Sequence, residues 1–517
     1  MVLAKALRPL RVVAVIFAVR ILSVLLVKTW YVPDEFWQSL EVAHKQVFGY
    51  GALTWEWQKG IRSYLYPTIV AALYTVLKYT GLDYPDALIY LPRILQAGLS
   101  TAADYSFYKW TGGRKWALFL ILTSWFWFYT SGRTLIQTTE TALVTIALSV
   151  FPFKDGLLGQ YEKESKTWVW LACVSVFVRP TTAALWLVLG AYNLATTKQS
   201  RLQLVTLYTL VIYNFLNSLV ALDSYFHGSL VVTPWEFFKL NVLNDITTHA
   251  CTFKSLNPIQ RPQPVHRHWY ITQGVPAILG IHLLPVLVGA AATLRRPREN
   301  RTGAVLLTAA ALHLVLHSFI KHKEFRFALP LLPAFLYVAQ DAVVRWSRKA
   351  KRYQLYTVAV TIAVCSAVPA LYCGQIHQSG AVGVMPLLRE AIPNNRSSIL
   401  FLMPCHSTPL YSHLHVNVTA RYLHCDPPID KPNTATESEA FYNNPQSWWR
   451  TEHATRQTPD LVVLYDILLG RVEGLLAGYK KLYEVPHTQA GEHILRYYPR
   501  VHPGNSSLYQ KGPTFLE

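Results

Sequence analysis

Two neighbouring carboxylates, Asp34 and Glu35, stand in the stretch VPDEFWQSLEVAHKQVFGYGALTWEW at residues 32–57. Neighbouring side chains diverge by about 100° on a helix, so we expect one of the two acids, rather than both, to serve a reacting atom. A carboxylate where the chain leaves the membrane can act as a general base for an attacking hydroxyl. Asp after Pro is equally typical of a helix N-cap, and that role stays an alternative for Asp34.

A second set of ionisable side chains forms the run HKEFRF at residues 322–327. His322, Lys323 and Arg326 surround Glu324, and such groups at membrane depth indicate function or mutual pairing. The alternative is that long side chains at the end of a span simply reach toward water. The natural functional partner is a phosphate, because Arg can bind two phosphate oxygens and Lys adds a point charge.

Together the two clusters predict transfer of a sugar from a lipid-linked phosphate. The basic cluster would stabilise the departing phosphate, while Asp34 would accept the proton of the attacking hydroxyl. A phosphate leaves without being protonated, so one carboxylate is enough, and the pair of carboxylates required for glycoside hydrolysis is not needed.

The elements that hold these clusters should be membrane helices. Of 517 residues, 52% are hydrophobic and 15% are charged, whereas soluble domains have about 25% charged residues. Apolar stretches recur along the chain, and we expect about eleven transmembrane helices. The net charge of +19 does not predict nucleic-acid binding, because the basic residues form short clusters beside apolar segments.

Those basic clusters predict the topology. Lys5, Arg8 and Arg11 precede the first apolar segment, which places the N-terminus in the cytosol and the first loop in the lumen. Basic runs at 295–301 and 345–352 predict two further cytosolic turns, so the hairpin tip between them also faces the lumen. The two clusters of site candidates are then on one membrane face.

One region does not fit this predicted topology. Between residues 81 and 166, Arg114 and Lys115 would face the lumen if every apolar stretch crossed the membrane. A re-entrant segment in this region would resolve the conflict. The first apolar segment lacks a cleavage site and is expected to remain as a signal anchor.

We expect two domains. Residues 1–373 form a transmembrane catalytic domain with lumenal loops at 28–62 and 223–270, and residues 374–517 form a lumenal domain of mixed α/β structure. Its polar, Pro-rich composition differs from that of the preceding chain. Within the first loop, the apolar residues of 36–48 recur at helical spacing, which predicts a helix lying in the membrane interface.

Sequons at Asn395, Asn417 and Asn505 agree with a lumenal tail, whereas the sequon at Asn300 falls in a predicted cytosolic turn. An oxidising lumen permits a disulfide between Cys405 and Cys425, with reduced buried thiols as the alternative.

Several other residues have a functional and a structural interpretation. Arg133 and Glu140 are seven residues apart, share a helix face and could line the substrate cavity, or form a buried structural pair. His266 and His268 could contact a headgroup from the second lumenal loop, or be interface residues. A further group, His406, His413 and His415 with Cys405, has metal-binding residue types, but its spacing fits no standard zinc pattern and no metal site is predicted.

The stretches at 32–57, HKEFRFALPLLP at 322–333 and FLMPCHSTPLYSH at 401–413 resemble the GPI mannosyltransferase 3 enzymes, which belong to the GT-C superfamily of polytopic, all-α membrane glycosyltransferases. The resemblance covers most of the chain. HKEFRF alone is similar to the wider group of dolichol-phosphate-mannose-dependent enzymes, which includes those extending the N-glycan precursor.

This resemblance implies an inverting α-1,2-mannosyltransferase of the endoplasmic reticulum membrane. Its donor would be dolichol-phosphate-mannose and its acceptor the second mannose of the GPI-anchor precursor, a glycolipid. Asp34 corresponds to the presumed base, with Glu35 as its substitute, and Arg326, His322 and Lys323 correspond to the donor-phosphate signature. No cofactor and no divalent metal are expected. A lipid transporter or scramblase, which should show two matching halves, and a non-catalytic subunit are the competing hypotheses.

Overall fold

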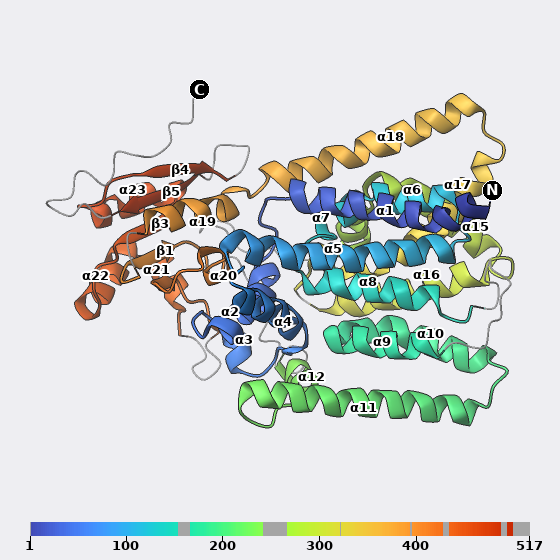
Figure 1. Ribbon diagram of the computed structural model, residues 1–517, viewed down its shortest axis with the longest axis horizontal. Helices are drawn as coiled ribbons and strands as arrows, with labels where there is room; N and C mark the ends of the chain where they lie inside the picture. Colours follow the sequence, from blue (N-terminus) through green and yellow to red (C-terminus); the bar gives the residue numbers. More distant parts are fainter. Residues whose placement is uncertain are drawn as a thin grey trace. The chain divides into compact units, whose positions relative to one another are not determined.

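The computed structural model describes residues 2–153, 166–240, 266–320, 322–392, 395–427, 434–487 and 494–499 (Figure 1). Asn505 and the middle of the predicted loop 223–270 lie outside these ranges. The chain divides into two compact units. One comprises Met1–Lys28 and Asp34–Gln375, and the other comprises Thr29–Pro33 and Ile376–Glu517. Whether the first unit alone carries catalysis stays a prediction.

The first unit is a body of helices that run side by side (Figure 1). Its main packing pairs are α5 with α8, α1 with α5, α15 with α17, α8 with α9 and α10 with α16. The α-helices are α1 (Val2–Leu26), α2 (Glu41–Phe48), α3 (Trp55–Gln58), α4 (Leu65–Thr80), α5 (Pro85–Trp110), α6 (Lys115–Thr123), α7 (Trp125–Thr130), α8 (Ile136–Ser149), α9 (Thr167–Val178), α10 (Ala183–Thr196), α11 (Arg201–His227), α12 (Thr233–Phe238), α14 (Val275–Leu279), α15 (Leu283–Arg295), α16 (Arg301–Phe319), α17 (Leu332–Ser347) and α18 (Arg352–Leu371). Short 3₁₀ and π turns extend several of them, at Phe36–Leu40, Pro180–Thr182, Tyr270–Gly274, Gly280–His282, Phe325–Leu331 and Tyr372–Ile376.

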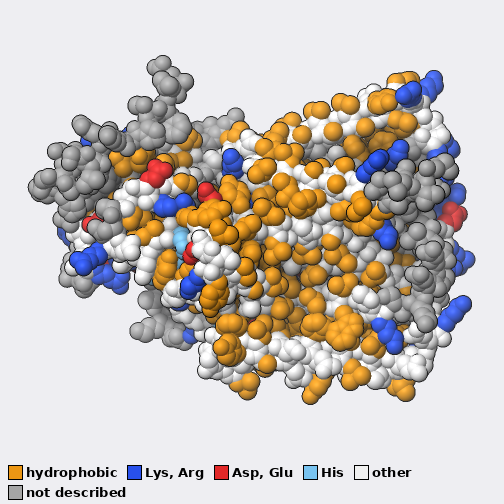
Figure 2. Space-filling model, viewed as in Figure 1, with side chains coloured by type: hydrophobic (Ala, Val, Ile, Leu, Met, Phe, Trp, Pro, Cys, Tyr) orange, Lys and Arg blue, Asp and Glu red, His pale blue; other side chains and the backbone are white. Residues whose placement is uncertain are grey.

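Within the described ranges, six helical segments are long and apolar enough to cross a membrane. They are Pro9–Leu26, Arg201–His227, Tyr270–Arg295, Arg301–Phe319, Phe325–Ser347 and Arg352–Ala391. Apolar side chains cover the helical body in Figure 2, and Lys and Arg side chains gather at the end where its basic turns lie. The expected count of about eleven spans stays a prediction, because helices such as α8 and α9 are shorter.

The structure corrects the topology near residue 114. A side-chain nitrogen of Arg114 lies 3.7 Å from Asp341, and Asp341 pairs with Arg345 at 2.7 Å. Arg114 is therefore at the same end of the body as the basic turn 345–352, not at the opposite end.

The reason is α4, which precedes the region 81–166 where a re-entrant segment was expected. With 16 residues it is roughly 24 Å long, shorter than the hydrocarbon core. It packs against α2, and Lys78 near its end donates to the carbonyl of Val47, 2.8 Å away. Because α4 stays beside α2, α5 is the helix that returns along the body (Figure 1).

A fully buried ion pair joins α1 to α5. The Arg20 Nε lies 2.6 Å from Asp104, and the indole of Trp127 donates to the same carboxylate at 2.8 Å. Ionisable groups inside a membrane protein require such partners, so this pair helps to fix the two helices against each other.

The second unit contains a five-stranded sheet in the order β2-β1-β3-β5-β4. Strand β1 is parallel to β2 and β3, while β5 is antiparallel to β3 and β4. Helices cover it around an apolar core that includes Leu400, Phe441 and Val462, so the mixed α/β structure is confirmed. Its elements are α19 (Gly380–Ala391), β1 (Ser398–Leu402), α20 (Tyr411–Leu414), β2 (Thr419–Tyr422), α21 (Glu437–Asn443), α22 (Pro445–Thr455), β3 (Leu461–Tyr465), α23 (Leu469–Val472), β4 (Tyr483–Pro486) and β5 (Ile494–Pro499), with 3₁₀ turns at Asp466–Leu468 and Glu473–Leu476.

Cys405 and Cys425 form a disulfide in this unit. Asn395 and Asn417 are both exposed. Asn300 instead caps α16 in the first unit, where its side chain accepts from the amide of Gly303.

Candidate active site

Asp34 begins a helical stretch that continues through the π turn Phe36–Leu40 into α2. Such π turns are frequent at functional sites. The helix differs from the interfacial helix expected from its pattern. Its polar residues Gln38, Glu41 and His44 are buried along with its apolar ones, so protein rather than lipid headgroups surrounds it.

The Asp34 carboxylate points at the HKEFRF segment. One of its oxygens lies 2.7 Å from the Arg326 guanidinium, and the exposed fractions of the two side chains are 19% and 5%. The two motifs, almost three hundred residues apart in the sequence, therefore meet within the first unit. Asp34 keeps some solvent access, whereas Arg326 is largely enclosed.

Glu35 points elsewhere, as the helical divergence of neighbouring side chains predicts. Its carboxylate lies 2.7 Å from Arg133, with 3% of Glu35 and 2% of Arg133 exposed. Arg133 also lies over the Tyr129 ring at 4.3 Å and donates to the Tyr129 carbonyl. Glu35 thus belongs to a closed structural network.

The predicted shared face of Arg133 and Glu140 is wrong. Arg133 precedes α8, which begins at Ile136, so a spacing of seven residues does not bring the two together. Glu140 instead lies 3.8 Å from Arg179 and accepts a hydrogen bond from Thr182.

Glu324 organises the HKEFRF segment. It accepts two hydrogen bonds from Arg326, at 2.5 and 2.7 Å, and one from His322 at 2.6 Å. Burial opposes its ionisation, but the Arg326 charge and the His322 hydrogen bond outweigh burial and lower the pKa of Glu324 below its usual value. Glu324 is therefore ionised, and its carboxylate holds the Arg326 guanidinium in place.

Lys323 does not join this network. Its Nζ donates to the carbonyl of Ile320 at 2.8 Å, and burial together with the charge of Arg267 lowers the pKa of Lys323. The three cations of the motif thus have different positions, and Arg326 is the one that contacts Asp34.

Two further arginines approach the site. Arg179, at the end of α9, lies over the Phe327 ring at 4.6 Å, and Arg326 lies over the same ring at 5.4 Å. Burial lowers the pKa of Arg179 and Glu140 opposes this effect, while Arg326 and Arg62 lower it further and Asp34 raises it. These charges are close enough to act on one another.

Arg62 completes the group. Its guanidinium lies 2.6 Å from Glu56, which also accepts a hydrogen bond from Gln38 at 3.2 Å. Burial opposes the Arg62 charge, but Glu56 and then Asp34 outweigh it and raise the pKa of Arg62, with Arg326 acting against them. Arg62 therefore stays cationic beside Asp34.

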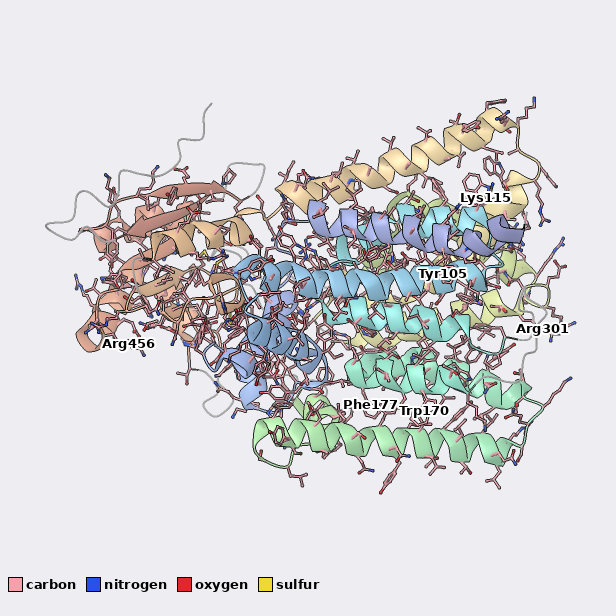
Figure 3. The ribbon with its side chains drawn as sticks, in the orientation of Figure 1. Tyr105, Lys115, Trp170, Phe177, Arg301 and Arg456 are labelled. Carbon is pink, nitrogen blue, oxygen red and sulfur yellow. A yellow bond between two sulfur atoms is a disulfide. The ribbon has the colours of Figure 1, made fainter. Side chains whose placement is uncertain are left out.

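Arg62 and Arg179 line a cleft with about 620 Å³ of empty space, part of it open to solvent. Most of the remaining wall is apolar. Figure 3 marks one of its side chains, Phe177 on α9, on the side of the helix that faces α11. The lining residues are Gln38, Trp57, Ile61, Arg62, Ser63, Leu65, Tyr66, Ile136, Phe177, Val178, Arg179, Pro180, Leu219, Thr233, Pro234 and Phe237.

The profile of the Alg9-like mannosyltransferase family matches residues 11–415. The chain belongs to this family. It is 44% identical to GPI mannosyltransferase 3 of Drosophila melanogaster, over 92% of this chain and 83% of the relative. It is 36% identical to GPI alpha-1,2-mannosyltransferase 3 of Danio rerio, over 93% and 88%, and 34% identical to that of Homo sapiens, over 93% and 85%. The resemblance inferred from the motifs is confirmed.

The fold of this Alg9-like mannosyltransferase is similar to that of ArnT from Cupriavidus metallidurans bound to undecaprenyl phosphate. The TM-score is 0.53 at 13% identity, covering 94% of this chain and 97% of ArnT. This likeness confirms the expected GT-C fold. The family match and the named relatives confirm the class of enzyme, a glycosyltransferase.

Two further candidates of the mannosyltransferase are the histidines of the predicted second lumenal loop. His266 and His268 stack on each other at 5.1 Å and are exposed, and neither lines the cleft. A different histidine pair is buried near the site. His313 and His317 stack at 4.1 Å, and a nitrogen of His313 lies 3.0 Å from the carbonyl of Phe327.

Among the described residues, Cys405, His406 and Cys425 have side-chain atoms close enough to share a metal ion. The two cysteines are joined in a disulfide, which removes both thiolates as ligands. His413 is buried and its ring lies 2.9 Å from the Ser412 hydroxyl.

Proposed function

We propose that this mannosyltransferase transfers mannose from dolichol-phosphate-mannose to the second mannose of the GPI precursor, forming an α-1,2 bond on the lumenal side of the endoplasmic reticulum membrane. The names of the relatives support this reaction, and the similarity to them extends over most of the chain. The observation that carries the mechanism is the contact of Asp34 with Arg326 next to a cleft lined by Arg62 and Arg179.

In this mechanism the O2 hydroxyl of the acceptor mannose attacks C1 of the donor mannose. The bond between C1 and the phosphate oxygen breaks, and its electron pair leaves with dolichyl phosphate. Asp34 takes the hydroxyl proton. Attack opposite the departing phosphate inverts the configuration at C1, and a single positioned base contributes about 10²–10⁴-fold to such a step.

We assign the donor phosphate to Arg62 and Arg179. Both line the cleft, and their forked guanidinium groups suit phosphate oxygens. Their apolar neighbours, including Phe177 and Leu219, suit an isoprenoid chain. Arg326 is committed to Glu324 and Asp34 by its contacts, so its role is to position Asp34. His322 would act through Glu324, and Lys323 has no contact that supports a part in phosphate binding.

An enzyme of the N-glycan precursor pathway is the second candidate, because HKEFRF is shared with that wider group. The deciding experiment incubates purified protein with labelled dolichol-phosphate-mannose and two acceptors, a dimannosyl GPI lipid and an N-glycan precursor. Label in the GPI lipid alone is the expected result. Label in the N-glycan precursor would replace the proposed acceptor, and movement of lipid without transfer of label would favour a scramblase.

A further inference from the structure

A second pocket lies between α15 and α17, at the end of the helical body that carries the basic turns. It has about 1150 Å³ of empty space, part of it open to solvent. Figure 3 marks Arg301 and Lys115 at this end, whereas α2 and α3, which follow Asp34, lie at the other end of the first unit. The lining residues are Ala292, Thr293, Arg295, Arg296, Glu299, Asn300, Tyr337, Gln340, Asp341 and Arg345.

Close packing of the two helices ends where this pocket begins. At Gly289 a Cβ atom would lie 2.3 Å from the carbonyl oxygen of Val338, so the backbones touch there. One turn further on, Thr293 already lines the pocket. Asn300 supports this wall, because its side chain donates to the Thr293 hydroxyl at 3.1 Å and accepts from Gly303 at 3.0 Å. The pocket is therefore part of the packed structure.

The pocket walls favour an anion. Three arginines line it against two carboxylates, and the closest pairs are Arg345 with Asp341 at 2.7 Å and Arg296 with Glu299 at 3.5 Å. Arg295, Arg296 and Glu299 are exposed at the rim. A phosphate group would meet guanidinium donors from both helices.

A buried hydrogen-bond donor without a partner in the described part of the chain is a second and independent indication that the pocket binds a ligand. Gln340 is 0% exposed and lines the pocket. Its Oε1 accepts from Arg114 at 3.2 Å, while its Nε2 has no partner among the described residues. A buried amide donor without a partner is unfavourable, and an acceptor oxygen bound in the pocket would satisfy it.

Lipid-facing side chains adjoin the pocket. Leu284, Leu287, Val288 and Leu294 of α15 are exposed on a helix apolar enough to cross the membrane. Leu294 immediately precedes the rim residue Arg295. A ligand with a phosphate head and two acyl chains could fill the pocket and cover this apolar surface together, which a free phosphate could not do.

We propose that the pocket between α15 and α17 binds the headgroup of an anionic phospholipid, with its chains along α15. The basic turns predict that this end faces the cytosol, where anionic lipids are enriched and where basic pockets between membrane helices bind such headgroups. The proposal concerns the end remote from Asp34, so it does not depend on the proposed reaction.

The test uses the full-length protein, stripped of lipid in a neutral detergent. Its thermal unfolding is measured with increasing short-chain phosphatidylinositol, with phosphatidylcholine of the same chain length, and with inorganic phosphate. The variant is the double substitution Arg295→Gln and Arg296→Gln. The matched control is Arg298→Gln with Arg301→Gln, which removes the same charge from the same exposed turn at residues that do not line the pocket.

We expect phosphatidylinositol alone to raise the unfolding temperature of the wild-type protein. The lining double variant should bind it about 30-fold more weakly, since each cation near a lipid surface contributes about 1 kcal/mol, and the control double variant should bind nearly as the wild type does. An equal loss in both doubles would reduce the effect to general surface charge. An equal response to inorganic phosphate or to phosphatidylcholine, or no response at all, would also overturn the proposal. Asp34→Asn should bind the lipid normally, which separates this result from any failure of mannosyl transfer.

Discussion

The paired substitutions Asp34→Asn and Glu35→Gln should fail in different ways although the residues are adjacent. Asn keeps the shape of Asp34 and can still accept a hydrogen bond from Arg326, and Arg326 keeps its two hydrogen bonds to Glu324. Asp34 is 19% exposed and Arg326 keeps the Glu324 carboxylate as a partner, so this substitution should cost much less stability than removing the carboxylate of a fully buried pair. The protein should stay folded, while the loss of the base lowers kcat by about 10²–10⁴-fold.

Glu35→Gln removes half of an ion pair whose members are 3% and 2% exposed. Removing the carboxylate from such a pair leaves the buried Arg133 charge uncompensated by Glu35 and costs about 3–5 kcal/mol, a large part of the stability of a typical protein. Abundance and unfolding temperature should therefore fall, while the rate per folded molecule changes less.

The assay measures initial rates with labelled dolichol-phosphate-mannose, divided by the amount of monodisperse folded protein from size-exclusion chromatography. The mechanism is refuted if Asp34→Asn retains more than roughly a tenth of the wild-type rate, since a general base is worth at least about 10²-fold. A folded but inactive Glu35→Gln protein, next to an active Asp34→Asn protein, would transfer the role of base to Glu35.

Three other predictions concern the phosphate, the helical body and metals. Arg62→Gln and Arg179→Gln should each lower kcat/KM for the donor by about 10²–10³-fold, as the loss of one preorganised donor to developing charge does, whereas the exposed Lys198→Gln should not; unchanged donor kinetics would place the phosphate elsewhere. Asp104→Leu should destabilise the protein by about 3–5 kcal/mol by leaving Arg20 unpaired, and adding Arg20→Met should recover much of that loss in thermal unfolding; a single variant as stable as the wild type would contradict this account. Chelation should leave the transfer rate unchanged because guanidinium groups carry the phosphate charge, and a loss restored by Mn²⁺ or Mg²⁺ would reverse that view.

Much of the site could be predicted because its chemistry is concentrated in two short segments. Asp34 follows the first span and Arg326 lies at the tip of a hairpin between two basic turns, so topology alone indicates that they share a membrane face. The divergence of Asp34 and Glu35 follows from helix geometry. The sequence could not show that Arg326 contacts Asp34 directly, which depends on how the hairpin packs.

Arg62 and Arg179 were missed because each stands alone. Arg179 closes the apolar run of α9 and precedes Pro180, and a charge in that position was the available signal. Its approach to Arg62 depends on which helices pack together, and no local spacing encodes that. The Arg133 to Glu140 spacing misled for the opposite reason, since a seven-residue interval has meaning only when both residues are in one helix.

The error in the expected topology near residue 114 has a similar origin. Hydropathy responds to the apolar side chains of α4, but it does not distinguish a helix buried among protein from one that faces lipid. The polar residues Glu41 and His44 of α2 are likewise buried, so an amphipathic pattern alone did not reveal what covers each face.

The short segment Thr29–Pro33 belongs to the compact unit of the C-terminal tail, although the chain on both sides of it belongs to the other unit. The amide of Trp30 donates to the carbonyl of Gln378 at 3.1 Å, and Asp34 is the next residue after this segment. Deleting residues 376–517 would therefore remove the hydrogen-bond partner of the backbone that immediately precedes the proposed base. The position of the proposed base in the chain therefore makes residues 29–33, and the tail residues that they contact, relevant to catalysis.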